Sequence, residues 1–473
     1  MQITVSNRAR NAALGTIMLT LFLETLNSSL VTVVMPDIKS SLHAPAQSVR
    51  WLISGHALGF GVTLLLAGRL ADVLGHRLIY LVGTAIFTAA SLWCAMGQDI
   101  DQLIAARLFQ GVGSAMVVPQ VMAFMQILFS ATQRVQKVPW LGASAGLGAT
   151  VGPVLAGVLA QGAGWRTVFW ADILFGLLAL GCGYAFLPRR TAQAGHRMNM
   201  PGTLLLSAAI ACLMMALSSL GQWDSLGTQL GYLVAAGALI AASRSRLISP
   251  DTPILPPALR RLTNLHLGMG MVVGLAASHA SFLVIFNYAL QHDRGSSPLY
   301  SGLMHLPYSA GVLAGMILLG RRFLIHHGRW VLAGGAVLLG VGATCVMLAV
   351  GMAHLPLQWA IPAIVLTGMG VGMSSGCIAP VCLAWVPVGD AGMASALLRL
   401  GQQAGFMLGS AVIVQPYFAE STPLDYSKDV LAIVPLQAIL VGVVVLALRL
   451  TQPLFPGQAA EAVSPRTPSP QNL

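Results

Sequence analysis

The residues best able to do chemistry are a few charged side chains inside long apolar stretches. Glu24 lies in the first stretch, Arg107 in the fourth and Arg399 in the thirteenth. A charge at the centre of a bilayer costs about 3 kcal/mol or more, so such residues usually mark ion or substrate pathways. A carboxylic acid can take up and release a proton, whereas an arginine keeps its charge and attracts a carboxylate. These residue types predict a proton or substrate site inside a membrane.

Glu24 and Asn27 lie on the same face of the first stretch, because residues three apart are neighbours on a helix. Burial opposes ionisation of a carboxyl group, and a nearby cation opposes that effect. We expect Glu24 to carry a proton or to meet a cationic substrate. The alternative is a glutamate near the inner interface with no role in transport.

The elements that must position these residues are fourteen apolar segments. Only 8% of the residues are charged, 56% are hydrophobic, and the mean hydropathy is +0.78. Crossing a bilayer takes about 20 apolar residues. The sequence predicts an all-α integral membrane protein with spans at 12–35, 48–68, 78–97, 103–128, 138–160, 167–187, 203–220, 226–242, 265–290, 299–319, 330–352, 358–384, 393–415 and 429–450.

The basic residues predict the orientation of these spans. Placing the N-terminus in the cytoplasm puts most of the 25 Lys and Arg residues on the inner side. The positive-inside rule then predicts that both termini are cytoplasmic in a bacterial-type inner membrane.

The spans divide into six, two and six. We expect an N-terminal six-helix bundle over 12–187, an inserted helix pair with a cytoplasmic linker over 188–264, a C-terminal six-helix bundle over 265–450 and a disordered tail over 451–473. Transporters commonly place a midplane site between two such halves and rock one half against the other. No Walker A sequence, metalloprotease motif or nucleophile elbow occurs in the sequence. We expect no enzyme activity and no cofactor, with energy from an ion gradient.

The loop after the second span reads GRLADVLGHR over 68–77. Gly68 and Gly75 are expected to allow a tight turn. Asp72 is a carboxylate beside basic groups, including Arg77, and it could face a helix N-terminus near 390–393. Such a contact would form in one conformation and break in another, which makes this loop a candidate latch.

Two further segments have distinctive spacings. The fourth span reads RLFQGVGSA over 107–115, and the fifth reads GATVGPVLAG over 148–157. Pro153 should kink its helix. The glycines around it, Gly148, Gly152 and Gly157, should allow close packing against a helix of the other half.

These three segments resemble signatures of the major facilitator superfamily, and the fifth-span segment is similar to the signature of its fourteen-helix drug:proton antiporters. The resemblance covers nearly the whole chain. It implies the major facilitator fold and a proton-coupled multidrug exporter of small amphipathic or cationic compounds, working by alternating access as a monomer without nucleic acid. The alternative is a metabolite exporter or another secondary transporter of the superfamily; a membrane sensor or scaffold is a third possibility. The resemblance also implies that Arg107 takes part in proton coupling.

The chain departs from the family pattern at several polar positions. The family has Asp where Asn27 stands in the first span, and commonly Asn where Asp172 stands in the sixth. Asp172 is expected to be either a second titratable site near the outer mouth or an interfacial carboxylate helped by Arg166. His56 replaces a frequent Tyr and could titrate near neutral pH.

The thirteenth span shows a related departure. Relatives often have Arg where Gln402 stands, whereas Arg399 lies one turn earlier. We expect Glu24 and Arg399 to have moved together towards the cytoplasm. Substrate contacts are expected from Glu24, Asn27, Trp51, His56 and Arg399.

Overall fold

The long apolar segments form helices in a computed structural model of the chain, which describes residues 7–129, 131–188, 200–219, 226–247, 257–351, 356–387, 390–414 and 425–450. Within these residues, thirteen helices are long and apolar enough to cross a membrane, and a shorter apolar helix covers Ile433–Leu448. The prediction of an all-α fold with fourteen apolar segments is confirmed. The predicted tail at 451–473 lies outside the described residues.

The first six long helices pack together and form what we call the N-terminal group. Helix α1 packs on α6 and α7, while α5 packs on α3 and α4. The elements are α1 (Asn7–Ser41), α2 (Ala46–Val49), α3 (Trp51–Leu74), α4 (His76–Met96), α5 (Ile100–Leu128), α6 (Ala131–Ala163) and α7 (Arg166–Phe186).

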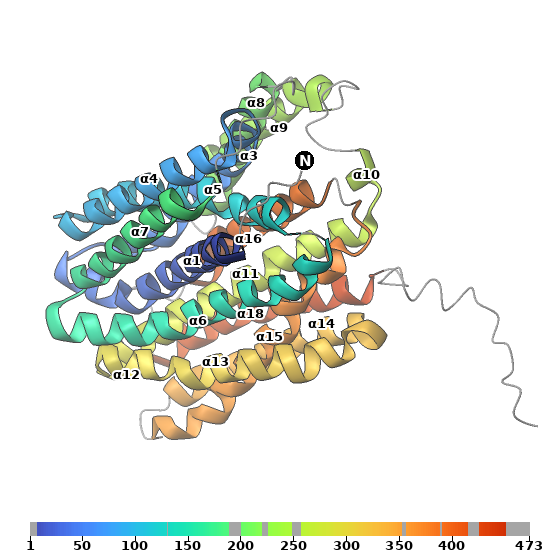
Figure 1. Cartoon of the computed structure of the whole chain (residues 1–473). Coiled ribbons are helices and arrows are strands. Elements are labelled where there is room, and N and C mark those ends of the chain that lie inside the picture. Colours follow the sequence, from blue (N-terminus) through green and yellow to red (C-terminus); the bar gives the residue numbers. More distant parts are fainter. Residues whose placement is uncertain are drawn as a thin grey trace, which may run out of the picture.

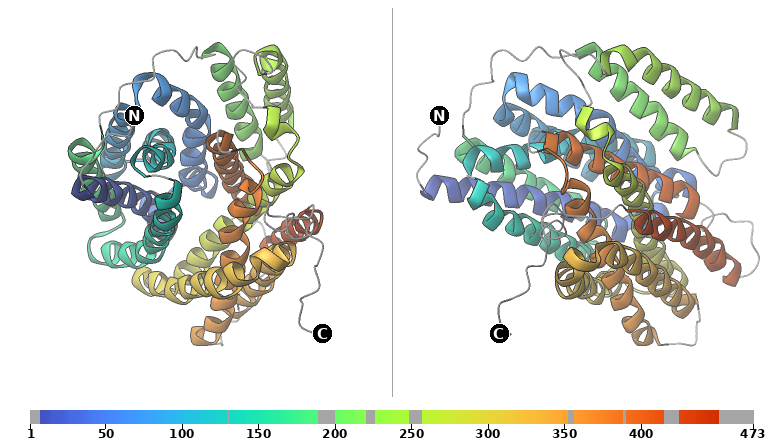
Figure 2. Two further views of the ribbon diagram at one scale, coloured as in Figure 1. Left: turned by 45° about the vertical axis from the view of Figure 1, so that its right-hand side comes forward. Right: turned by 90° about the vertical axis from the view of Figure 1, so that its right-hand side faces the viewer.

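The later helices form a second set, the C-terminal group. Helix α11 packs on α16 and α18, and α15 packs on α13 and α14. The elements are α11 (Thr263–Tyr288), η2 (Ala289–Asp293), α12 (Pro298–Leu303), α13 (His305–Ala314), η3 (Gly315–Gly320), α14 (Arg321–Gly351), η4 (Leu357–Ala360), α15 (Ile361–Leu383), α16 (Ala391–Gly409), η6 (Ser410–Val414) and α18 (Asp425–Leu448). Figure 2 shows the blue-to-cyan helices on one side and most of the yellow-to-red helices on the other.

The inserted pair, α8 (Met200–Ser218) and α9 (Leu226–Leu247), lies at the edge of the bundle (Figures 1 and 2). Helix α8 packs on both α3 and α16, whereas α9 packs on α8. The end of the Met214 side chain lies against Gly61 of α3, 2.4 Å from the position that a Cβ atom there would take. The pair therefore covers the joint between the two groups. The short helix α10 (Pro257–Arg260) precedes α11. We retain 12–187, 188–264 and 265–450 as proposed domain boundaries.

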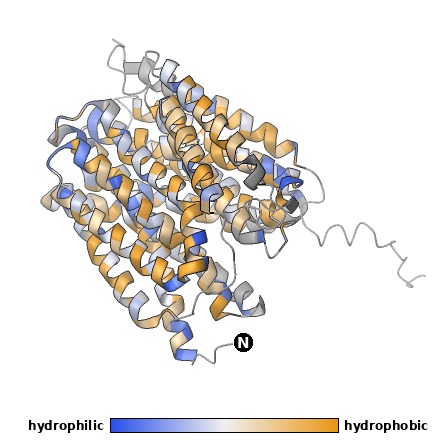
Figure 3. Cartoon of the chain, turned by 90° about the horizontal axis from the view of Figure 1, so that it is seen from above, coloured by the Kyte–Doolittle hydropathy of each residue, from blue (hydrophilic) through white to orange (hydrophobic). Residues whose placement is uncertain are grey.

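Hydrophobic residues predominate along the helices in Figure 3. Large apolar side chains stay exposed on the outside of the bundle, among them Leu174, Val234 and Val441. In water such surfaces would drive association, whereas hydrocarbon solvates them. This distribution fits a multi-pass membrane protein.

The turn between α3 and α4 depends on Gly75, whose φ of 96° lies in the left-handed region that favours glycine. Its amide donates to the Ala71 carbonyl and ends α3. The expectation that Gly68 shapes the same turn is wrong, because α3 stays helical through Gly68 to Leu74. The neighbouring residues supply enough i to i+4 hydrogen bonds to carry one glycine within a long helix.

Backbone-to-backbone contacts join the two groups at one end of the bundle. We call this the outer end, following the predicted orientation; it also holds Ser41, which accepts a hydrogen bond from Trp165. A Cβ atom added at Gly157 on α6 would lie 2.6 Å from the Pro298 carbonyl oxygen. One added at Gly302 on α12 would lie 2.3 Å from the Pro153 carbonyl oxygen. The expected close packing of the fifth-span glycines against the other half is confirmed for Gly157.

Two side-chain hydrogen bonds also join the two groups at this end of the bundle. Gln291 donates from Nε2 to the Val33 carbonyl (2.9 Å), and the Lys39 ammonium donates to the Tyr288 hydroxyl (3.1 Å). Each contact links α1 to the end of the α11–η2 segment. The two groups are therefore in contact at the outer end.

Gly157→Val should impair transport and lower the apparent melting temperature in detergent, because the new side chain would collide with backbone atoms that cannot turn aside. Overpacking of this kind costs about 1–3 kcal/mol. Gly162→Val on the same helix is the matched control, since a Cβ atom there has nothing within 4 Å. Equal effects of the two substitutions would contradict the close contact.

Candidate functional site

The N-terminal group holds a buried arginine with three hydrogen-bond acceptors. Arg107 on α5 is 3% exposed. Its Nε donates to the Leu52 carbonyl (2.9 Å), and one terminal nitrogen donates to Asn27 Oδ1 (2.9 Å) and Gln110 Oε1 (2.7 Å). A buried cation is tolerable when hydrogen bonds replace its water. The contacts tie α5 to α1 and α3.

Asn27 extends this network to a carboxylate. Its Nδ2 donates to Asp172 Oδ2 at 2.6 Å, while its carbonyl oxygen faces Arg107. The amide orientation is determined by these partners, since a carboxylate only accepts hydrogen bonds and a guanidinium only donates them. Asn27 is a neutral bridge between two charged groups on α5 and α7.

Asp172 does not lie at the membrane interface, which was one of the two positions expected from the sequence. Its side chain is fully buried, so it is not an interfacial carboxylate. Arg166 instead donates to the Gly97 carbonyl (2.8 Å) and lies over the Trp165 ring. The interfacial prediction is wrong because Asp172 lies on the buried face of α7, together with Val168 and Phe169.

The other end of the network reaches α4. Gln110 donates from Nε2 to Ser91 Oγ (2.7 Å), and the Cys94 thiol lies 3.9 Å from Gln110 Oε1. Arg107, Gln110 and a third polar residue, Ser114, recur at three and four residues, which places them on one helix face. That spacing is visible in the sequence, and it indicates that Gln110 lies within reach of Arg107.

Glu24 stands beside this network, with a partner of its own. Ser114 donates to Glu24 Oε2 at 2.7 Å, while the hydrogen bonds of Arg107 go elsewhere. The carboxylate also interacts electrostatically with Arg107 and with Arg399 of the C-terminal group. Arg107 therefore contacts Asp172 through Asn27 but does not hydrogen-bond Glu24.

Two exposed side chains, Arg399 and Ser28, lie near Glu24. Arg399 is exposed and donates to Gln402 Oε1 at 3.0 Å, and Ser28 on the next turn of α1 from Glu24 is also exposed. Glu24 itself is half-buried. Because these residues lie near the middle of long apolar helices and carry opposite charges across the two groups, we infer that they border the accessible space between the groups.

Trp51 and His56 lie elsewhere on α3. Trp51 is its first residue, at the outer end, and is half-buried. His56 is 6% exposed, its ring lies 6.4 Å from that of Phe60, and its Nε2 has no hydrogen-bond partner among the described residues. Between them, Ser54 forms a hydrogen bond of 2.8 Å with Ser410 of the C-terminal group.

The predicted latch is not engaged in this conformation. Asp72 is exposed, and within the described ranges it makes no hydrogen bond or ion pair. Arg77 donates to the Tyr184 carbonyl and lies over the Tyr184 ring, both within the N-terminal group. The two groups are therefore packed at the predicted outer end, whereas the predicted latch contact at the other end is not formed among the described residues.

Two glycines of the fifth-span segment pack against α1 next to Glu24. A Cβ atom at Gly148 would lie 2.2 Å from Thr25 Oγ1, and one at Gly152 would lie 2.7 Å from Ser29 Cβ. Their absent side chains let α6 approach the turns of α1 that flank Glu24. The expected packing against the other half is therefore wrong for Gly148 and Gly152, because the helix that they approach, α1, belongs to the same N-terminal group.

The C-terminal group has a separate polar cluster that we did not predict. Ser301 donates to Asn287 Oδ1 (2.7 Å), and His305 Nδ1 donates to the Ser301 carbonyl (2.9 Å). Nearby, the His279 ring stacks on Tyr308 at 5.8 Å. These residues come from α11, α12 and α13, whose contacts could not be read from spacing along one helix.

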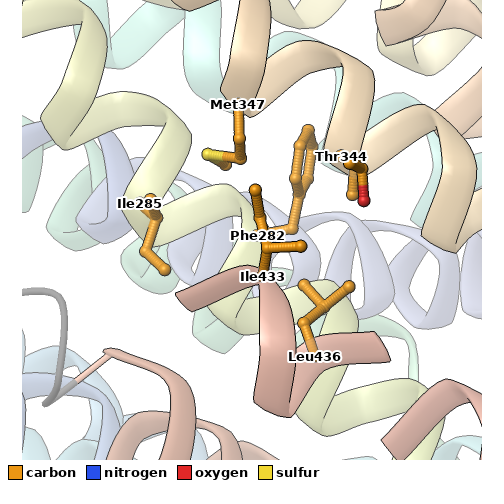
Figure 4. A pocket seen from close by; sticks show the side chains of 7 residues that line it. Phe282, Ile285, Thr344, Met347, Ile433 and Leu436 are labelled. Carbon is orange, nitrogen blue, oxygen red and sulfur yellow. The ribbon is translucent and has the colours of Figure 1, made fainter. Parts of the chain in front are cut away.

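A pocket between α11, α14 and α18 is apolar (Figure 4). Its one hydroxyl, on Thr344, already accepts a hydrogen bond from Gln437 Nε2 at 2.7 Å. Such a pocket offers no charged group to a substrate or a proton. It is lined by Phe282, Ile285, Ala343, Thr344, Met347, Ile433 and Leu436.

Asn27→Ala should destabilise the protein by about 3 kcal/mol, because it removes hydrogen bonds to two buried charged groups worth about 1.5–3 kcal/mol each. Unfolding in detergent would measure the change. Ser28→Ala is the adjacent control, since its exposed hydroxyl bonds only the Glu24 carbonyl among the described residues. Similar stability of both variants would show that the bridge contributes little.

Comparison with known proteins supplies the family. Residues 17–249 match the Major Facilitator Superfamily. The chain is 31% identical over 400 residues to the puromycin resistance protein of Streptomyces alboniger, covering 83% of this chain and 78% of the relative. It is 28% identical over 426 residues to the probable actinorhodin transporter of Streptomyces coelicolor, covering 86% and 72%.

A solved structure agrees in fold. The human organic anion transporter TETRAN superposes with a TM-score of 0.63 at 17% identity, over 93% of this chain and 99% of that one. The resemblance seen in the three sequence segments is confirmed. From these matches and from the fourteen apolar segments, the chain belongs to the major facilitator superfamily.

Proposed function

We propose that this protein is a proton-coupled exporter of small amphipathic or cationic compounds, including antibiotics, that works by alternating access. The observation that carries the proposal is Glu24, a carboxylate on the accessible face between the two groups, backed by the buried Arg107 network. It is supported by relatives named as an antibiotic resistance protein and an antibiotic transporter. We place the protein in a bacterial inner membrane with both termini cytoplasmic, acting as a monomer, without enzyme activity or a cofactor.

In the proposed cycle, Glu24 binds a cationic substrate and a proton at different times. In the inward-facing state it accepts from Ser114 and interacts with Arg399, so it is held ready to meet a cationic substrate. After rocking, a proton from outside neutralises Glu24 and weakens its hold on the cation. The substrate leaves, the protonated carboxyl returns to the inner side, and Glu24 releases its proton to the cytoplasm before it binds the next cation.

The opening and closing contacts fit this cycle. The outer end is closed by glycine-mediated contacts between α6 and α12, which separate without breaking a charged pair. Asp72 is exposed in this state and is available to make the predicted latch contact when the inner end closes.

A second function is favoured by one observation. Arg399 is exposed on the same face as Glu24, so it could bind an anionic compound. The alternative is therefore export of an anionic metabolite by the same alternating-access route.

Glu24→Gln should abolish proton-driven uptake of ethidium into inverted membrane vesicles, because the amide cannot take up a proton or balance a cation. Uptake is followed by fluorescence after a proton gradient is imposed. Ser40→Ala, at the other end of α1, should transport like the wild type, since its exposed hydroxyl bonds only the Asp37 carbonyl among the described residues. Full activity of Glu24→Gln would assign the proton site elsewhere, and no uptake by the wild type would argue against a cation exporter.

Arg399→Gln should lower ethidium transport more than Gln402→Ala, since only the former removes the charge that interacts with Glu24. Coupling between two such sites typically changes an equilibrium about 5–150-fold. The two variants are compared for initial rate and for apparent affinity. The reverse order of effects would overturn the idea that the charged layer has moved one turn inward.

A further inference from the structure

The strongest unexplained feature is a buried carboxylate that the proposed cycle does not use. Asp172 is fully buried, and its Oδ2 accepts one hydrogen bond, from Asn27. Its Oδ1 has no hydrogen-bond partner among the described residues. An ionised carboxylate in such surroundings is costly unless every lone pair is satisfied. The second oxygen is therefore a position where a proton can bind.

The charged and titratable groups facing Asp172 come from three helices. They are Arg107 on α5, Cys94 on α4 and Glu24 on α1, which all interact with it electrostatically. Only Arg107 carries a permanent positive charge in this set. Its link to Asp172 runs through the Asn27 side chain, 2.6 Å from the carboxylate and 2.9 Å from the guanidinium.

Asn27 and Asp172 each differ from the residue type that the resemblance implies at their position. The resemblance described above implies a carboxylate at position 27 and commonly an amide at position 172, whereas this chain has Asn27 and Asp172. The structure shows that the two departures are one hydrogen-bonded pair. An exchange inside such a pair keeps one acid and one amide next to Arg107.

We propose that the acid and the amide have exchanged helices, so that Asp172 on α7 acts as a second proton site and signals its charge to Arg107 through Asn27. When Asp172 is ionised, it orients the Asn27 amide and keeps the Asn27 carbonyl on Arg107. When a proton binds, the carboxylate no longer holds the Asn27 amide as strongly, and Arg107 can change partners. The proton enters and leaves at the carboxyl group, and no other bond changes.

This inference rests on the proposed function, and it divides the labour between two acids. Glu24 is half-buried on the accessible face, where a substrate can reach it. Asp172 is sealed behind it, where a proton can bind but a drug-sized compound cannot. The sealed acid would respond to the proton gradient even when the substrate site is filled.

The test is an exchange experiment on the full-length protein. Asp172→Asn, Asn27→Asp and the double variant Asn27→Asp/Asp172→Asn are compared with the wild type for gradient-driven ethidium uptake. We expect Asp172→Asn to lower uptake by about ten-fold, within the usual range of coupling between two sites. The double variant should recover most of that loss, and Asn27→Asp, with two acids, should shift the pH profile of uptake.

Two outcomes would overturn the inference. One is full uptake by Asp172→Asn. The other is a double variant that has the wild-type melting temperature but recovers none of the loss. Wild-type uptake tests the proposed function by itself, so failure of the wild type is distinguishable from failure of the exchange.

A spectroscopic test works even if ethidium is not a substrate. A protonated carboxyl group has an infrared C=O stretch that the ionised group lacks. Difference spectra of the wild type between mildly acidic and alkaline pH should show a carboxyl band that is absent from Asp172→Asn and kept in Glu24→Gln. The same bands in Asp172→Asn as in the wild type would contradict a titrating Asp172.

Discussion

The constraint on which the rest of this structure depends is the burial of Arg107. A guanidinium cannot lose its proton, so inside a membrane protein it must be surrounded by acceptors. The acceptors come from the backbone of α3, from Asn27 on α1 and from Gln110 on α5 itself. Satisfying one side chain therefore determines how three helices meet. The two acids of this region have separate partners, since Asp172 accepts a hydrogen bond from Asn27 and Glu24 accepts one from Ser114.

The two halves meet in a different way. At the outer end, Gly157 and Gly302 let backbones touch, and their contacts depend on shape rather than charge. Dispersion and close packing drive helix association in lipid, where the hydrophobic effect between helices is absent. Such contacts can separate without leaving a buried charge unpaired. The charge network around Arg107 lies within one half, whereas the halves meet at the outer end through backbone contacts and through hydrogen bonds from Gln291 to Val33 and from Lys39 to Tyr288. Such an arrangement suits a rocking mechanism.

The inserted pair adds a structural element across this joint. Helix α8 touches both α3 and α16, the helices that face each other between the groups. Met214 is suited to such a position because its side chain is flexible and adapts to irregular surfaces. Helix α9 packs on α8 and exposes most of its surface, so lipid surrounds it.

Composition and periodicity by themselves determined the helical membrane fold and the fourteen apolar segments, and they pointed to Glu24 and Arg107 as candidate site residues. Those conclusions need only the cost of placing backbone and charge in hydrocarbon. The partners of the charged residues were decided by the tertiary structure. The sequence led us to expect a part in proton coupling for Arg107 but gave no partner for it. It also allowed an interfacial Asp172 and placed Gly68 in a turn. The spacing within one helix shows which residues share a face, but hydrogen bonds such as Asn27 to Asp172 join residues far apart in the chain. Their partners depend on how helices rotate and pack, because a side-chain hydrogen bond requires its two atoms to come within about 3 Å of each other.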